Sequence, residues 1–264
     1  MKPIGIFDSG IGGLTVTKEI IQQLPYEDIV YFGDTAHLPY GVKSKETVIR
    51  LSIENILFLL KQRVKLICVA CNTSSSVALP VIRNNFNVPI VDVIEPAVRE
   101  AVYATKNKRI GIIGTKATIR SHTYKVMIKK LNPKIKVLEI ACPLFVPLVE
   151  EGWIEGRIVK EIAKIYLKPL KNVGIDTLIL GCTHYPLLKP TIRQVMGSKV
   201  ILIDSAKQVA IEVKRILETL GMVNRRARLG VHKFYVSDDP EGFGRLAPRF
   251  LGSYVDNVRR VNHV

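Results

Sequence analysis

Two cysteines, Cys71 and Cys182, occupy matching places in the chain, each at the end of a short apolar run. The first lies in "LICVACNTSSSV" and the second in "LILGCTHYPLL", and a helical pattern follows each run. A thiol at the start of a helix lies near free N–H groups and the positive end of the helix dipole, both of which lower its pKa. A lone cysteine is more often a core residue, but two at corresponding places predict a pair of bases with lowered pKa values.

Thiols on opposite sides of a substrate suit one class of reaction, the inversion of a stereocentre. One base removes a proton from one face of a carbon atom, and an acid returns a proton to the other face. A thiolate and a thiol do this without a cofactor, and their titrations are coupled because two thiolates in a small cavity repel each other. We therefore expect neither a cofactor nor a metal ion.

Polar residues near the two thiols suit an anionic substrate. The short hydrogen-bond donors are Ser9, Asn72, Thr73 and Thr183. Beside free backbone N–H groups, such donors bind carboxylates and hold the extra negative charge of a carbanion-like transition state. Asp8 either receives an ammonium group or assists proton transfer, unless it is an N-cap or turn residue.

Three further features each have a functional and a structural interpretation. His184, two residues after Cys182, is either an acid–base group that orients the thiol or a structural histidine. Tyr40 and Gly41 lie in the turn signature "LPYG", which closes a pocket or is simply a turn. The stretch "DSGIGG" is a weak candidate for a phosphate loop, because it lacks both the GxGxxG and the Walker spacing.

The composition is that of an ordinary globular protein of 264 residues, 47% apolar and 23% charged. The net charge of +16 is compatible with nucleic-acid binding, but Lys and Arg are scattered over predicted helices without interleaved aromatics, so we expect no nucleic-acid partner. Cys68 and Cys142 are predicted to be core residues. Sparse cysteines favour a reducing cytoplasm, and no apolar run predicts a membrane span or a signal peptide.

Short apolar runs alternate with longer segments of helical periodicity. Strands are predicted at 3–8, 28–33, 65–70, 89–93, 109–114, 136–141, 176–181, 199–203 and 231–236. Helices are predicted at 13–23, 44–62, 74–85, 95–106, 117–130, 145–151, 155–171, 186–195 and 205–220, with a last short helix ended by Gly252. Because nearly every strand precedes a helix, we expect α/β architecture with parallel sheets and helices on both faces.

Three pairs of stretches repeat in the same order at nearly the same distance along the chain. "IGIFDSG" is similar to "IGIIGTKATIRS", "VYFGDTAHLPYG" to "LEIACPLFVPLVEEG", and "LICVACNTSSSVALP" to "LILGCTHYPLLKP". This predicts two similar α/β domains related by a pseudo-two-fold duplication. Ligands of open α/β sheets bind at the carboxyl ends of strands, so we expect the active site in the cleft between the domains.

These motifs together resemble those of the glutamate racemases in the aspartate/glutamate racemase superfamily. The matching stretches, between residues 4 and 241, are "IGIFDSGIGGLTV", "YFGDTAHLPYG", "CVACNTSSSVALP", "GIIGTKATIRSHTY", "CPLFVPLVEEG", "LGCTHYPLL" and "FYVSDDPE". The resemblance implies cofactor-independent interconversion of L- and D-glutamate for peptidoglycan synthesis. It also implies a homodimer and a discontinuous first domain, residues 1–97 plus 207–264, with residues 98–206 as the second.

The resemblance assigns roles residue by residue. Cys71 would act on the D-enantiomer and Cys182 on the L-enantiomer, with proton transfer assisted by Asp8, Glu150 and His184. The substrate-pocket positions are Asp8, Ser9, Tyr40, Gly41, Asn72, Thr73, Thr115, Thr118, Thr183 and His184.

The sequence leaves alternatives open. In related aspartate racemases the second motif resembles Gly-Cys-Thr-Glu, so His184 favours glutamate over aspartate. His37 stands where many family members have Arg, although it lies beside the turn rather than beside a thiol. A metal-binding protein that uses Cys71, Cys182 and His184 is a further alternative, but the chain lacks a close ligand pair with zinc-finger spacing.

Overall fold

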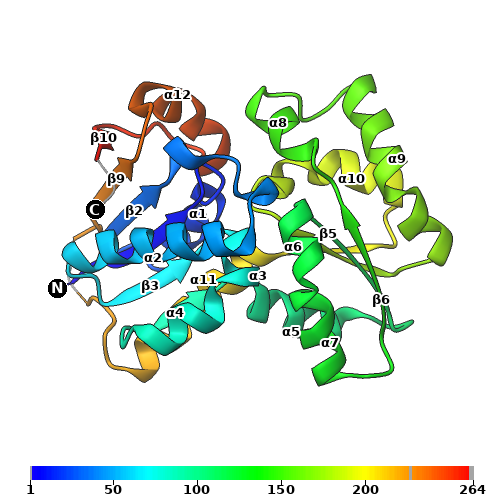
Figure 1. Cartoon of the computed structure of the whole chain (residues 1–264), viewed down its shortest axis with the longest axis horizontal. Coiled ribbons are helices and arrows are strands. Elements are labelled where there is room, and N and C mark those ends of the chain that lie inside the picture. The colour runs from blue at the N-terminus through cyan, green and yellow to red at the C-terminus, as the bar shows by residue number, and fades with distance from the viewer. Residues whose placement is uncertain (1, 226–227, 262–264) are drawn as a thin grey trace.

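The computed structural model of the protein describes residues 2–225 and 228–261. These residues form two parallel sheets that lie side by side (Figure 1). The first sheet, in the order β10-β9-β2-β1-β3-β4, consists of β10 (Arg259–Arg260), β9 (His232–Val236), β2 (Ile29–Gly33), β1 (Ile4–Asp8), β3 (Leu66–Val69) and β4 (Ile90–Asp92). The second, in the order β6-β5-β7-β8, consists of β6 (Lys136–Ala141), β5 (Arg109–Gly114), β7 (Thr177–Gly181) and β8 (Ile201–Asp204).

The two sheets repeat one topology. The order β2-β1-β3-β4 in the first sheet corresponds to β6-β5-β7-β8 in the second. Strand β1 pairs with β2 and β3, and in the same way β5 pairs with β6 and β7. Cys71 follows β3 and Cys182 follows β7, so the two cysteines come after equivalent strands. The predicted α/β fold with two similar parallel-sheet units is confirmed.

Helices cover both faces of the sheets. They are α1 (Leu14–Gln23), α2 (Lys45–Lys61), α3 (Asn72–Val77), α4 (Leu79–Asn85), α5 (Ile94–Ala104), α6 (Lys116–Ser121), α7 (Thr123–Leu131), α8 (Phe145–Glu150), α9 (Arg157–Val173), α10 (Lys189–Met196), α11 (Ser205–Thr219) and α12 (Pro240–Leu251). Short 3₁₀ helices are η1 (Thr35–His37), η2 (Tyr40–Val42) and η3 (Tyr185–Leu188).

The central strand β1 shows why the sheet needs two helical layers. Its side chains alternate between faces: Ile4 and Ile6 belong to one hydrophobic cluster, and Phe7 belongs to another. All three are fully buried, as expected for a parallel strand covered on both sides. The first cluster continues into the second sheet through residues such as Ile112 and Leu180, so apolar packing joins the two halves.

Three predicted helices are interrupted. The segment 74–85 divides into α3 and α4 at Ala78, because Pro80 has no N–H to donate to the carbonyl of Ser76. The segment 117–130 divides into α6 and α7 at His122, which adopts a left-handed conformation with φ of 54°. The segment 186–195 begins as η3 before α10.

The expected division into domains at 97/98 and 206/207 falls inside α5 and α11. Helix α11 packs against β4 of the first sheet and against β7 of the second, and α5 packs against α11, β7 and β8. These two helices therefore connect the halves rather than belong to one of them alone. Among the described residues, no helix is both long and apolar enough to cross a membrane.

Candidate active site

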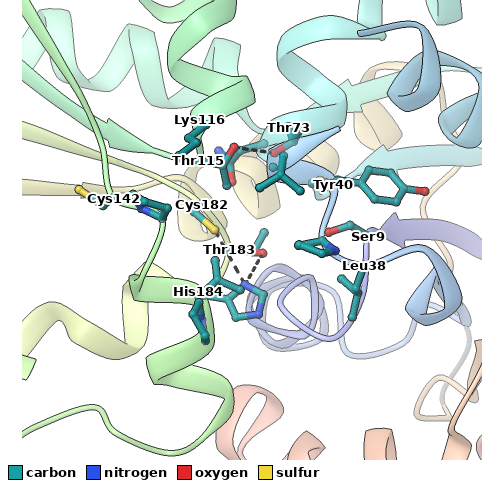
Figure 2. Close-up of a pocket in the computed structure, with 18 of the residues that line it drawn as sticks. Ser9, Leu38, Tyr40, Thr73, Thr115, Lys116, Cys142, Cys182, Thr183 and His184 are labelled. Atoms are coloured by element: carbon teal, nitrogen blue, oxygen red, sulfur yellow. Dashed lines mark hydrogen bonds between the residues drawn. The ribbon is translucent and has the colours of Figure 1, made fainter. Parts of the chain in front are cut away.

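A cavity of about 260 Å³ lies between loops that follow the strands of the two sheets (Figure 2). Its walls combine residues from both halves: Ser9, Leu38, Pro39, Tyr40, Gly41, Val42, Cys71, Asn72, Thr73, Thr115, Lys116, Cys142, Pro143, Val146, Pro147, Glu150, Cys182, Thr183 and His184. Both thiols therefore open onto one space, as expected for a reaction at two faces of one carbon atom. Of the predicted site residues, Asp8 and Thr118 do not line it.

Cys71 is the N-cap of α3, and its Sγ accepts a hydrogen bond from the N–H of Ser74 at 3.5 Å. Burial and the charge of Asp8 nevertheless raise the pKa of Cys71 to about 11, against opposing hydrogen bonds from Ser74 and Ser9. The predicted lowering of this pKa is therefore wrong. A six-residue helix does not offset the removal of a thiolate from water.

Cys182 begins a chain of three polar groups. Its Sγ lies 3.9 Å from Nδ1 of His184, and Nε2 of His184 lies 3.0 Å from Oε1 of Glu150. Burial lowers the pKa of His184, but hydrogen bonds and charge interactions with Cys182 and Glu150 outweigh it and raise this pKa to about 10. The raised pKa favours the imidazolium form of His184, and Figure 2 shows its ring directed toward the thiol.

Asp8 lies behind the cavity rather than in its wall. It is fully buried at the end of β1, and its Oδ2 accepts a hydrogen bond from the N–H of Gly10 at 2.9 Å. Burial raises its pKa, while the charge of His184 opposes that rise. Because Asp8 also raises the pKa of Cys71, it interacts electrostatically with residues of both cysteine motifs.

Three threonine hydroxyls meet at the boundary between the halves. Oγ1 of Thr73, from α3, lies 3.0 Å from Oγ1 of Thr115 and 3.3 Å from Oγ1 of Thr118. Thr115 and Thr118 are themselves 3.0 Å apart, and Thr115 is the N-cap of α6. Thr118 therefore lies behind the other two hydroxyls, while Thr73 and Thr115 face the cavity (Figure 2).

The turn after η1 lines one side of the cavity with Leu38, Pro39, Tyr40, Gly41 and Val42. The hydroxyl of Tyr40 points away from the cavity in Figure 2 and donates to Oδ2 of Asp34. A Cβ added to Gly41 would lie 2.6 Å from Cβ of Thr115, so only glycine allows the turn to approach α6 this closely. The predicted role of this turn in closing the pocket is compatible with its position.

The chain matches a family model described as Asp/Glu/Hydantoin racemase over residues 4–212. It belongs to this family. A glutamate racemase from Geobacter metallireducens is 50% identical over 261 residues, which cover 99% of this chain and 97% of that protein. Crystal structures of glutamate racemases from Bacillus anthracis and Francisella tularensis, the second in complex with D-glutamate, superpose with TM-scores of 0.95 and 0.93. Each is 39% identical, covering 99% of this chain and 97% of the other.

In this member of the racemase family, sequence reasoning missed part of the cavity wall. Lys116 supplies a cationic side chain between Thr115 and Thr118, and Cys142, Val146 and other residues of "CPLFVP" supply a largely apolar wall. The similarity of "CPLFVPLVEEG" to the "LPYG" turn of the first half was the available signal. Cys142 was predicted to be a core residue; it is fully buried, and it also borders the cavity.

No metal-binding cluster is found among the residues that the structure describes. Over residues 2–225 and 228–261, no three His, Cys, Asp or Glu side chains gather closely enough to hold a metal ion. All four cysteines lie in this part of the chain and are free thiols.

Proposed function

We propose that this protein is a glutamate racemase that interconverts L- and D-glutamate through two cysteine bases. The observation that carries the proposal is the placement of Cys71 and Cys182 on one cavity, each after the equivalent strand of a duplicated fold. The relatives named glutamate racemase, similar along almost the whole chain, support the substrate.

The reaction needs one proton removed and one returned. With L-glutamate bound, the Cys182 thiolate takes the Cα proton and becomes a thiol, and the electron pair stays on the substrate as a carbanion. The Cys71 thiol then gives its proton to the opposite face, which leaves D-glutamate and a Cys71 thiolate. The pKa of about 11 keeps Cys71 a thiol at neutral pH, which is the state this direction requires.

The surrounding residues take supporting roles in this proposal. The cationic His184, held by Glu150, stabilises negative charge beside Cys182, and Asp8 modulates the charge around both motifs. The groups we assign to the substrate are Ser9, Tyr40, Gly41, Asn72, Thr73, Thr115 and Thr183, with Thr118 behind them. D-Glutamate made in this way would supply peptidoglycan synthesis.

Racemisation in D₂O tests the function directly. We expect L-glutamate, without added cofactor, to lose optical rotation while its Cα gains deuterium, and L-aspartate to react much more slowly. Cys71→Ser and Cys182→Ser should each reduce inversion by about 10³-fold or more, because serine is a far weaker base. Absence of both exchange and rotation change would exclude a racemase, and full activity of both variants would exclude the two-thiol mechanism.

We also propose the cellular and quaternary setting. Free, buried thiols suit a reducing cytoplasm, and the resemblance to glutamate racemases supports a homodimer. We propose residues 1–97 with 207–264 as one domain and 98–206 as the other, with α5 and α11 spanning the boundary. Sedimentation equilibrium tests the dimer, and a single monomeric species at micromolar concentration would contradict it.

A further inference from the structure

A buried tyrosine of α7 connects the two cysteine motifs. Tyr124 is fully buried, and its hydroxyl accepts a hydrogen bond of 2.8 Å from Nδ2 of Asn72. Asn72 directly follows Cys71 in the first half, whereas Tyr124 belongs to the second half. Helix α3 packs against both α6 and α7, so this hydrogen bond lies where the halves meet (Figure 1).

The hydrogen bond leaves one end of the Asn72 side chain available. Asn72 lines the cavity and is 2% exposed, and its Oδ1 has no hydrogen-bond partner among the described residues. A carboxamide has a donor end and an acceptor end, so the bond to Tyr124 decides which end is free. A buried acceptor without a protein partner is costly, and an ammonium group of the substrate would satisfy it.

The ring of Tyr124 lies beside the second cysteine motif. A Cβ added to Gly181 would lie 3.3 Å from Cε2 of Tyr124 and 2.7 Å from the carbonyl oxygen of Ile113, so the ring packs closely beside the residue that precedes Cys182. The tyrosine therefore bonds to a neighbour of one thiol and lies beside a neighbour of the other.

We propose that Tyr124 is a positioning residue, which orients the Asn72 carboxamide toward the substrate and fixes the spacing of the two cysteine motifs. It acts through Asn72 and Gly181 and does not touch the substrate. This inference rests on the proposed racemase function, and it concerns a residue outside the cavity wall.

The variant Tyr124→Phe removes only the hydroxyl. Nδ2 of Asn72 then loses its partner and the carboxamide is free to turn, so we expect KM for both enantiomers to rise by about tenfold. A purely structural defect would lower the melting temperature and the active fraction, and so the apparent kcat, but would leave KM unchanged. An unchanged KM in a folded Tyr124→Phe protein would overturn the proposal.

Thr123→Val is the matched control. Thr123 lies next to Tyr124 on α7, and its Oγ1 donates to the carbonyl oxygen of Ser76 on α3 at 2.7 Å, the carbonyl that Pro80 leaves free. The control therefore removes a similar bond between the same two helices while leaving the contacts of Asn72 and Gly181 unchanged. We expect a similar loss of melting temperature, with KM within about twofold of the original value.

A double-mutant cycle with Asn72→Ala tests the route of the effect. If Tyr124 acts through Asn72, Tyr124→Phe should change KM by less than about twofold in the Asn72→Ala background. An equal rise in KM in both backgrounds would refute that route. Calorimetric titration with D-glutamate measures the same quantities as dissociation constants, so the positioning role remains testable even if the unmodified protein binds glutamate without inverting it.

Discussion

Removal of the Glu150 charge should shift the pH dependence of catalysis without abolishing catalysis. In the unmodified protein Oε1 of Glu150 lies 3.0 Å from Nε2 of His184. Glu150→Gln keeps an oxygen near this nitrogen but removes the carboxylate that helps raise the pKa of His184 to about 10. The pKa of His184 must therefore fall. Because the imidazolium exists only below this pKa, the variant loses the positive charge beside Cys182 at a lower pH.

The size of the shift follows from the geometry. A hydrogen bond to a charged group contributes about 1.5–3 kcal/mol, and about 1.4 kcal/mol corresponds to one pKa unit. The side chain of Glu150 is 30% exposed and that of His184 only 4%, so solvent weakens the interaction and the lower end applies. We expect the alkaline limb of kcat/KM to move by about one pH unit toward lower pH, with activity near neutral pH nearly unchanged.

Initial rates of racemisation, followed by circular dichroism from about pH 6 to about pH 11, measure this limb in the free enzyme. Glu151→Gln is the matched control, because it removes the same charge from an exposed neighbour that does not line the cavity. Coincident alkaline limbs for Glu150→Gln and the original protein would refute the assigned role of Glu150. An equal shift in Glu151→Gln would indicate a general effect of net charge instead.

Two further substitutions test the packing around the site and the fold. Gly12→Ala would place a Cβ 2.2 Å from Oγ1 of Thr183 and 2.5 Å from Nδ1 of His184, so kcat/KM should fall by about 100-fold or more. Gly244→Ala is the control and should retain activity, because its Cβ would meet only Val258 at 4.0 Å. Equal activity of the two variants would contradict this. Lys65→Met leaves Glu27 buried without its ion-pair partner, which lies 2.5 Å away in the unmodified protein. Urea unfolding should therefore show that the free energy of unfolding falls by about 3–5 kcal/mol, with KM unchanged. An unaltered unfolding midpoint would show that the pair is dispensable.

Much of the architecture could be predicted because it depends on local patterns. Apolar runs such as Ile4–Asp8 and Thr177–Gly181 form strands where the sequence places them, and the repeated order of motifs predicts the repeated order of strands. The helix breaks at Ala78 and His122 were missed for different reasons. Pro80 was a visible signal for the first, whereas a left-handed histidine has no strong sequence signature.

The residues of the candidate site that directly follow a strand could be predicted from the sequence. Cys71 and Cys182 meet because the carboxyl ends of equivalent parallel strands face one cavity, and the residues adjacent to them in sequence come with them. Lys116 and Cys142 enter the same cavity through the shape of the loops, which composition does not reveal. Asp8, predicted as a substrate-pocket residue, is fully buried at the end of a central strand and is not among the residues that line the cavity.

The sequence by itself determined which groups are available for chemistry: two thiols, a histidine and a set of short donors, repeated in two halves. Only the tertiary structure decided their protonation and orientation. The pKa of Cys71 rises instead of falling because desolvation and the charge of Asp8 depend on packing in three dimensions. For the same reason the contact between Asn72 and Tyr124, which joins two helices from different halves, follows from the fold and not from spacing along the chain.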